Sequence, residues 1–280
     1  MIKAISYWST KGGLENTNPI DAALAEVKAA GFEGIELAVG LDGVLHTGTS
    51  QTDCEAIRGK IESSGLKMET VAAGLTWAIN PTSEDADTRK KSIQAHAAAI
   101  ERTAWLGGKA MLMVPGVVKS PISPDIIRYD LAVSRCREAV TQLLGVAEKV
   151  GVDLCLENVW NGLFYSPLEF AEFVDSFDSD RLGVYFDVGN GLGYHQYPPH
   201  WIELLGSRIR RVHVKDYQEN FNWTGGYTFC DLGAGEVPWP ETMQALKAAG
   251  YDKTLVAEIL PWSPGVLERT SAAMDVIMGM

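Results

Sequence analysis

The sequence has few cysteines, an excess of acidic over basic residues and no long hydrophobic run. Its cysteines are far apart and form no C-x-x-C pair, which argues against a disulfide framework: Cys54, Cys136, Cys155 and Cys230. The net charge of −12 argues against nucleic acid as a partner, because a phosphate backbone requires clustered Lys and Arg. No apolar stretch approaches the ~18 residues that span a bilayer, and the N-terminus lacks the apolar core of a signal peptide. We therefore expect a cytoplasmic protein that binds neither nucleic acid nor membrane.

What the sequence does contain is a regular alternation of strand-like and helix-like segments over its 280 residues. The predicted strands are residues 3–8, 34–39, 67–73, 110–114, 152–157, 182–187, 209–214 and 254–259. A doubly wound open sheet is the alternative, but no G-x-G-x-x-G follows the first strand. We predict an α/β protein formed by a single (β/α)₈ TIM barrel over residues 1–280.

Local signals set the expected boundaries of the helices. Asn18 is the expected N-cap of the first helix, with Pro19 at its first helical position. A later helix is expected from Ser123 to about residue 150, and residues 216–237 are expected to form a long loop.

Charged side chains end four of the predicted strands, all in the second half of the chain. They are Glu157, Asp187, His213 and Glu258. In a barrel the carboxyl ends of the strands meet at one mouth. Singly, each residue is better explained as a helix cap, a hydrogen-bonded core group or part of a rim ion pair. Together they predict one divalent-metal site, because burying three carboxylates without a cation is unfavourable.

The predicted ligand set, three carboxylates and one imidazole, favours a hard divalent cation. Mn²⁺ is our first choice, and Mg²⁺, Co²⁺, Fe²⁺ and Zn²⁺ are also compatible. Lys215 lies two residues after His213 and so points to the same side of the strand. We give equal weight to two interpretations of Lys215. In one it contacts a substrate oxygen or phosphate, and in the other it forms a salt bridge with Asp187 or Glu258.

Several other residues near strand ends are candidate substrate contacts. The predicted set is Trp8, His46, Trp160, Asn161 and Asn190. Trp77, Trp223, Trp239 and Trp262 also fall near strand ends, where aromatic rings stack on a sugar or on a group attached to it; core packing is the alternative for each. Glycines 225, 226, 233 and 235 could offer backbone N–H groups to a phosphate, but no Lys or Arg occurs between Tyr217 and Val237.

Four motifs around these residues resemble the xylose-isomerase-like sugar phosphate isomerase/epimerase superfamily. They are LENVWN at 156–161, YFDVGN at 185–190, VHVKD at 212–216 and DLGAGE at 231–236. The most similar branch contains L-ribulose- and L-xylulose-5-phosphate 3-epimerases and hexulose-phosphate isomerases. The resemblance implies that Glu157, Asp187, His213 and Glu258 hold one divalent cation, that the two glutamates act as acid and base, and that the protein is a homodimer or homotetramer.

The expected function is therefore metal-dependent epimerisation or isomerisation of a ketose or ketose phosphate. Glu157 would remove a proton beside the carbonyl, giving an enediolate that the metal stabilises, and Glu258 would return one to the other face. One alternative is a lyase on the same scaffold, an inosose or 3-dehydroshikimate-type dehydratase or an enzyme that eliminates from 3-keto-glycosides. A second is a sugar-binding barrel without catalysis, which does not require two glutamates on one cation.

Other branches of the superfamily differ from this sequence at informative positions. Ketose 3-epimerases that act on free sugars carry His, Glu and Arg where this chain has Asn190, Leu163 and Glu219. These differences argue against a tagatose- or psicose-type epimerase. The endonuclease IV branch uses several more histidines than the five present here, which argues against DNA repair.

Overall fold

A closed barrel of parallel strands organises the chain, of which the computed structural model describes residues 1–219 and 227–280. Around the barrel the strands follow the order β1-β10-β7-β6-β5-β4-β3-β2, and each neighbouring pair is parallel. Their bounds are β1 (Ile2–Ser6), β2 (Gly34–Ala38), β3 (Thr70–Ala73), β4 (Ala110–Met113), β5 (Asp153–Glu157), β6 (Leu182–Asp187), β7 (Ile209–Val214) and β10 (Thr254–Ala257).

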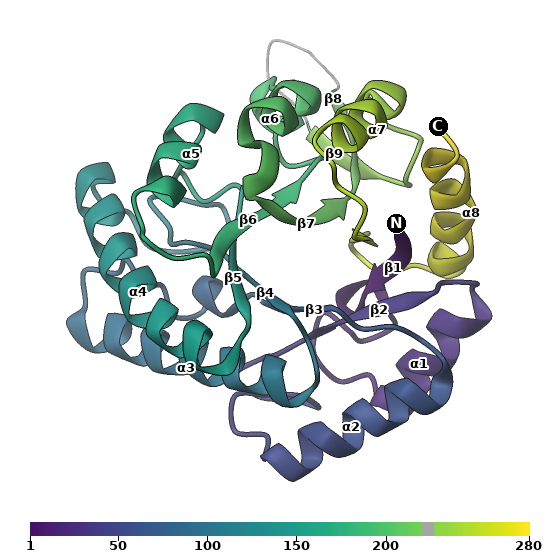
Figure 1. Ribbon diagram of the computed structural model, residues 1–280, viewed down its shortest axis with the longest axis horizontal. Helices are drawn as coiled ribbons and strands as arrows, with labels where there is room; N and C mark the ends of the chain where they lie inside the picture. The colour runs from purple at the N-terminus through teal and green to yellow at the C-terminus, as the bar shows by residue number, and fades with distance from the viewer. Residues whose placement is uncertain (220–226) are drawn as a thin grey trace.

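Helices connect the strands and form a ring outside the barrel (Figure 1). Those of the described residues are α1 (Ile20–Ala29), α2 (Gln51–Ser64), α3 (Ala86–Trp105), α4 (Tyr129–Val150), α5 (Pro167–Asp175), α6 (Pro198–Leu205), α7 (Trp239–Ala248) and α8 (Val266–Met278). The predicted (β/α)₈ barrel is confirmed. None of the helices in these residues is long and apolar enough to cross a membrane.

Two hydrophobic clusters fix the shape of the barrel. The larger cluster lies between strands and helices, and strands such as β2 and β6 are buried at every residue, as expected for parallel strands covered on both faces. The smaller cluster consists of Ala72, Ala110, Leu112, Cys155 and Tyr185. It fills the barrel interior: the Tyr185 hydroxyl on β6 reaches the Glu36 carboxylate on β2, on the opposite side of the barrel.

Three sequence-based boundaries are wrong because tertiary contacts override the local signals. Helix α1 begins at Ile20, with Pro19 as its cap, since the Asn18 side chain donates to the Thr10 hydroxyl. Helix α4 begins at Tyr129 rather than Ser123, and the Asp125 carboxylate accepts a hydrogen bond from Asn80. The expected loop 216–237 contains two antiparallel strands, β8 (Asp216–Glu219) and β9 (Tyr227–Cys230).

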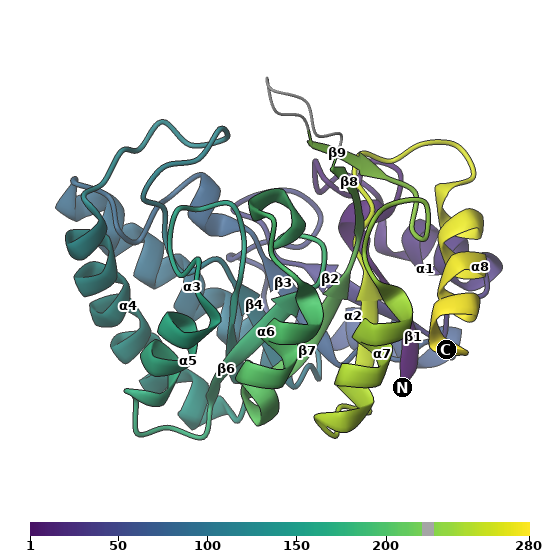
Figure 2. The ribbon, with the colours of Figure 1, turned by 90° about the horizontal axis from the view of Figure 1, so that it is seen from above.

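The β8–β9 pair places further side chains beyond one end of the barrel. Figure 2 shows it at the end opposite the N and C labels. Strands β5, β6 and β7 run toward this end, so it is the mouth at which their last residues meet.

A buried histidine makes the packing of α3 sensitive to pH. His96 is fully buried, and its ring nitrogens contact the Ser92 carbonyl oxygen at 2.8 Å and the Thr76 hydroxyl at 3.3 Å. Burial lowers the pKa of His96 from 6.5 to about 4, and the Ser92 carbonyl offsets only part of this effect. The unfolded chain therefore binds one more proton than the folded chain between these two pKa values.

We expect this difference to destabilise the protein as the pH falls below about 6.5. Between pH 7 and about pH 5 the histidine should cost about 2 kcal/mol of unfolding free energy. Urea denaturation gives the unfolding free energy of the unaltered protein and of His96→Gln at both pH values. The effect of His96 is the loss of unfolding free energy between the two pH values in the unaltered protein minus the loss in His96→Gln. His200→Gln, at an exposed position on α6, is the control. Equal pH dependence in His96→Gln and the unaltered protein would contradict the assignment.

Candidate metal centre

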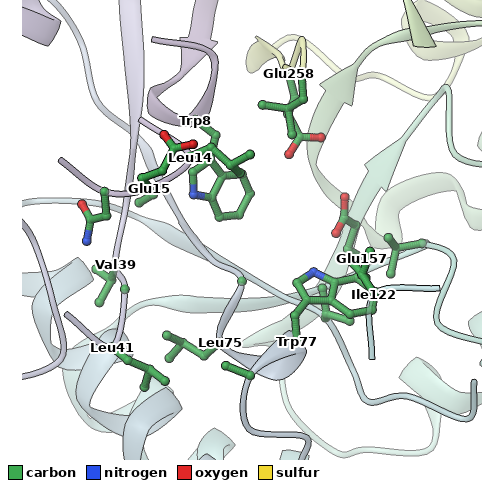
Figure 3. A pocket seen from close by; sticks show the side chains of 18 of the residues that line it. Trp8, Leu14, Glu15, Val39, Leu41, Leu75, Trp77, Ile122, Glu157 and Glu258 are labelled. Carbon is green, nitrogen blue, oxygen red and sulfur yellow. The ribbon is translucent and has the colours of Figure 1, made fainter. Parts of the chain in front are cut away.

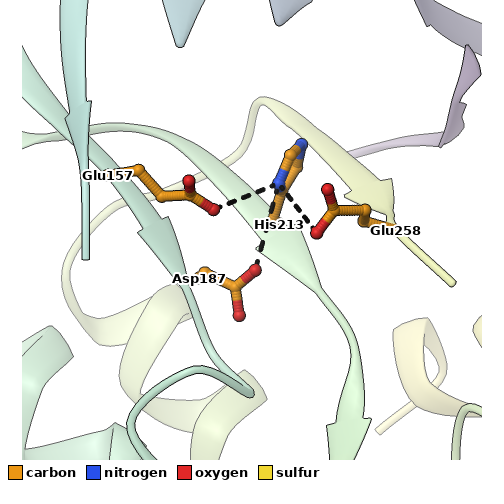
Figure 4. A group of neighbouring side chains, drawn as sticks. All are labelled: Glu157, Asp187, His213 and Glu258. Carbon is orange, nitrogen blue, oxygen red and sulfur yellow. Dashed lines mark ion pairs between the residues drawn. The ribbon is translucent and has the colours of Figure 1, made fainter. Parts of the chain in front are cut away.

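The predicted ligands from four strands converge at the mouth of the barrel. Glu157 ends β5, Asp187 ends β6, His213 lies in β7, and Glu258 follows β10. The exposed fraction is 6% for each glutamate and zero for Asp187 and His213. One donor atom from each residue lies within 4.8 Å of all the others. Figure 4 shows the three carboxylates arranged around the imidazole.

The Nδ1 atom of His213 lies at the centre of this group. It is 3.8 Å from Glu157 Oε1, 3.9 Å from Asp187 Oδ2 and 3.9 Å from Glu258 Oε2, beyond hydrogen-bonding distance of each. Among the described residues this buried nitrogen has no hydrogen-bond partner. A nitrogen donor without a partner, surrounded by carboxylate oxygens, is the arrangement expected of a cation site.

Asp187 has two functions that the sequence presented as alternatives. Its Oδ1 atom accepts hydrogen bonds from the backbone N–H groups of Gly189 and Asn190, both at 2.9 Å, and so stabilises the turn after β6. Its Oδ2 atom faces His213. The Asn158 side chain donates to the Asp187 carbonyl and accepts from its N–H, which holds the ends of β5 and β6 together. Asp187 is therefore both a turn cap and a candidate ligand.

Lys215 forms the salt bridges that were one of its two interpretations. Its buried ammonium lies 2.9 Å from Asp187 Oδ2 and also contacts Glu258 Oε2. The rings of Trp160 and Phe229 are 5.7 and 5.6 Å from the same atom. The ammonium thus offsets part of the negative charge of the cluster, and the aromatic rings favour a cation at this position.

The two glutamates of the cluster differ in proton affinity. Burial raises the pKa of Glu157 to about 7, although His213 and Lys215 lower it in part. Burial also acts on Glu258, but the charges of Lys215 and His213 outweigh it, and the pKa of Glu258 is lowered below its ordinary value. Two neighbouring carboxyl groups with separated pKa values are the arrangement that acid–base catalysis uses.

Sequence reasoning missed Glu36, a fully buried carboxylate on β2. Its Oε1 atom is 2.8 Å from His213 Nε2, and its Oε2 atom accepts hydrogen bonds from the hydroxyls of Tyr185, at 2.5 Å, and Thr70, at 3.3 Å. A carboxylate on Nε2 favours the tautomer that leaves Nδ1 for a metal. The signal in the sequence was a single charged residue inside the apolar strand Gly34–Ala38.

A cavity of about 620 Å³ opens directly above the cluster. Glu157, Lys215 and Glu258 form one side of it, and the predicted contacts Trp8 and Trp160 also line it. Trp77 is a further lining residue (Figure 3). Of the four clustered residues, Glu157 and Glu258 line this cavity, so their carboxylates are accessible to a small molecule, whereas Asp187 and His213 are fully buried.

The other predicted substrate contacts do not line this cavity. Asn190 donates to Glu157 Oε1 at 3.4 Å and to the Asn158 carbonyl at 2.8 Å, so it positions a candidate ligand. The Asn161 side chain donates to the Gly116 carbonyl and accepts from the Leu163 N–H within the loops. His46 lines a separate surface hollow beside α2.

The remaining tryptophans have other environments. Trp239 is buried and donates to the Asp216 carboxylate, and Trp262 is partly exposed with Lys11 over its ring. Trp223, with Gly225 and Gly226, lies outside the described residues.

The glycine-rich segment after β9 is organised by Asp216. This buried carboxylate accepts hydrogen bonds from the N–H groups of Gly233 and Val237 and from the Trp239 indole. A Cβ at Gly235 would lie 2.2 Å from Asp216 Oδ1, so only glycine fits there. The Gly233 N–H that we considered for phosphate is already paired within the protein.

Comparison with known proteins gives the family. The family described as xylose isomerase-like TIM barrel matches residues 24–275. The chain belongs to this family. The match agrees with the superfamily resemblance of the motifs around Glu157, Asp187 and His213.

Curated relatives of this xylose isomerase-like protein match it in part. The uncharacterized protein MJ1311 of Methanocaldococcus jannaschii is 26% identical over 189 residues, which are 64% of this chain and 60% of that protein. The 3-oxo-isoapionate decarboxylase of Pectobacterium atrosepticum is 32% identical over 99 residues, 34% of this chain and 36% of that enzyme. The chain thus spans less than two thirds of either relative.

Solved structures match over almost their whole length. A D-tagatose 3-epimerase-like protein has a TM-score of 0.80 and 18% identity, covering 100% of this chain and 97% of that one. The 3-keto-D-glucoside 4-epimerase of E. coli has a TM-score of 0.76 and 13% identity, covering 100% of both chains. The IOLI protein with a bound zinc atom has a TM-score of 0.76 and 18% identity, covering 100% and 98%. At these identities the likeness shows a shared fold.

The four clustered residues fit a divalent cation. Donors ~2.1 Å from such an ion lie roughly 3 Å apart when adjacent and roughly 4 Å apart when opposite. The observed separations of 3.8 and 3.9 Å from Nδ1 are close to the larger value for all three oxygens, and only one donor can lie opposite Nδ1, so the other carboxylates would move closer to Nδ1 on binding. Burial would lower the pKa of His213, but Glu36 and the other carboxylates raise it well above its ordinary value, so metal binding would displace a proton.

We expect Glu36→Gln to weaken metal binding by about 10–100-fold, because the amide cannot accept hydrogen bonds from His213, Tyr185 and Thr70 as the carboxylate does. Titration calorimetry with Mn²⁺ on metal-free protein measures the dissociation constant. Glu203→Gln, at an exposed position on α6, is the matched control and should bind Mn²⁺ like the unaltered protein. Thermal unfolding of the metal-free proteins separates a loss of affinity from a loss of fold. Unchanged affinity in a folded Glu36→Gln variant would refute the role of Glu36.

Proposed function

We propose that this protein is a divalent-metal-dependent epimerase or isomerase of a ketose or ketose phosphate. The observation that carries the proposal is the placement of Glu157 and Glu258. Both belong to the metal-ligand cluster, and both border the same cavity. A site that only bound a sugar would not require two ionisable carboxylates in contact with both a cation and the ligand.

Each glutamate uses one oxygen toward the cluster. Glu157 faces His213 through Oε1, and Glu258 faces it through Oε2. The second oxygen of each carboxylate is thereby left for a substrate carbon between them. One glutamate, ionised at the start, removes the proton beside the carbonyl. The other, protonated at the start, gives its proton to the opposite face, which inverts the centre, and exchange with solvent restores both glutamates.

The proposed cation would be held by Glu157, Asp187, His213 and Glu258, with Mn²⁺ as the first choice. When bound, it would stabilise the negative charge that develops on the substrate oxygens. Asp187 and Glu36 contribute by orientation: Asp187 is fixed by its turn, and Glu36 directs His213. In this proposal Lys215, which forms salt bridges with Glu258 and Asp187, would hold a substrate oxygen.

A lyase is the second candidate, and the tryptophans of the cavity favour it. Proton removal beside a carbonyl is also the first step of elimination, and Trp8, Trp77 and Trp160 could accommodate a leaving group. The solved structures with a similar fold include sugar epimerases, which supports a sugar as the substrate.

Assembly into a homodimer or homotetramer stays a prediction.

Proton NMR in D₂O tests the proposal. Protein loaded with Mn²⁺ is incubated with pentuloses, hexuloses, their phosphates, inosose and 3-keto-glucosides, and the metal is removed by chelation before spectra are recorded. We expect deuterium to enter one carbon as an epimer or isomer forms. Glu157→Gln and Glu258→Gln should lower the rate by roughly 10²–10⁴-fold, because each removes an acid–base group. Glu203→Gln should retain the rate.

Calorimetry on both variants is needed because these glutamates are also candidate ligands. A slow variant that still binds Mn²⁺ supports the acid–base role. Deuterium exchange followed by new ultraviolet absorbance, from a loss of water or of an aglycone, would move the assignment to the lyase. The absence of deuterium exchange with every one of these substrates would refute the epimerase and isomerase proposal.

A further inference from the structure

The two halves of the barrel mouth have different chemistry. The candidate ligands come from β5, β6, β7 and the end of β10. The opposite wall of the cavity comes from the segments that follow β1, β2, β3 and β4, and most of its side chains are apolar: Trp8, Leu14, Val39, Leu41, Leu75, Trp77, Val114 and Ile122. Figure 3 shows Leu14, Leu41 and Leu75 across the cavity from Glu157 and Glu258. We call this the apolar wall.

Parts of the apolar wall are exposed to solvent. The exposed fraction is 54% for Leu14, 42% for Leu41 and 56% for Ile122, and the three residues come from three different loops. Scattered exposed leucines are ordinary, but several that face one cavity mark a binding surface. The wall therefore offers apolar area that a ligand can cover.

The wall also contains flat aromatic surface. Trp8 packs closely on the backbone at Gly74, where a Cβ would be 3.2 Å from the Trp8 ring and 3.7 Å from Trp77. Trp8 further packs against the Tyr185 cluster inside the barrel. The glycine thus allows two partly exposed indoles to approach the same point of the backbone, and indole faces bind planar groups well.

The charge of the cavity does not suit a phosphate. Among the described lining residues Lys215 is the only base, and its ammonium already contacts Asp187 and Glu258. The two other charged groups, Glu15 and Asp42, lie on the far side and are acidic. An anionic group there would meet carboxylates and no cation, which is unfavourable.

The size of the cavity exceeds what one sugar ring fills. Its volume of about 620 Å³ is in the range, ~300–1,000 Å³, that encloses drug-sized ligands. A sugar placed against Glu157 and Glu258 would leave the apolar wall without a partner.

From the apolar wall, its indoles and the lack of a free cation among the described lining residues, we infer that the substrate is an uncharged keto-glycoside. Its sugar lies at the two glutamates, and its planar, apolar aglycone lies on Trp8, Trp77 and Leu41. This inference rests on the metal-dependent proton transfer of the proposed function, and it replaces the free ketose or ketose phosphate by a glycoside with a carbonyl in its ring. A glycosidic bond holds the anomeric carbon as an acetal, so the carbonyl that activates the proton must be at another carbon of the ring.

The test compares phenyl and methyl 3-keto-β-D-glucosides as probes for the Mn²⁺-loaded protein. We expect deuterium exchange with the phenyl compound to have a kcat/KM at least about 10-fold higher, since the phenyl ring covers the apolar wall. Leu41→Ser and Trp77→Ala should lower kcat/KM for the phenyl compound more than for the methyl compound, and so reduce the phenyl preference. Leu168→Ser, an exposed leucine on α5 away from the cavity, should retain the phenyl preference.

The outcomes separate this inference from the proposed function. Faster exchange with free ketoses or ketose phosphates than with either glucoside would overturn the inference and leave the epimerase proposal standing. If no compound exchanges deuterium, the inference is tested by binding instead. Tryptophan fluorescence then measures the binding of phenyl and methyl β-D-glucoside. Binding of the phenyl compound that is lost in both cavity variants supports the apolar wall as the aglycone site. Equal binding of both compounds, or binding unaffected by the variants, refutes it.

Discussion

The close burial of three carboxylates is the constraint on which the rest of this structure depends. Glu157, Asp187 and Glu258 would repel one another strongly in a dry environment, and each is at most 6% exposed. The Lys215 ammonium on one side and the His213 ring in the middle offset part of this repulsion. The same negative charge is suited to a divalent cation, so the charge that the fold must compensate is also the charge that a metal site would use.

The barrel interior extends this cluster to the opposite wall. Glu36 on β2 contacts His213 on β7 and Tyr185 on β6, so one buried carboxylate links β2 to two adjacent strands across the barrel. A bulky tyrosine can cross the barrel because Ala72 and Ala110 are small. The orientation of the imidazole thus depends on packing below the mouth as well as on the ligands around it.

The candidate metal ligands and the apolar wall lie on different sides of the mouth. The four clustered residues come from the second half of the chain, whereas the apolar wall comes from loops of the first half. This division explains why the motifs that resemble sugar isomerases cluster between residues 156 and 236. The loops that form the apolar wall lack such motifs, and loops of this kind tolerate substitution better than the strands that carry the ligand cluster.

The sequence by itself determined the barrel and its candidate ligands, because strand periodicity and a charged residue at a strand end are local patterns. The features that the sequence could not reveal depend on contacts between residues far apart in the chain. Glu36 is far from His213 in the chain, and the pairing exists only because the barrel closes. Asn161 and Asn190 resembled substrate contacts, but their amides satisfy backbone and carboxylate groups that only the folded loops bring near. The tertiary structure alone decided which side chains share the cavity, since that depends on eight separate loops meeting at one rim.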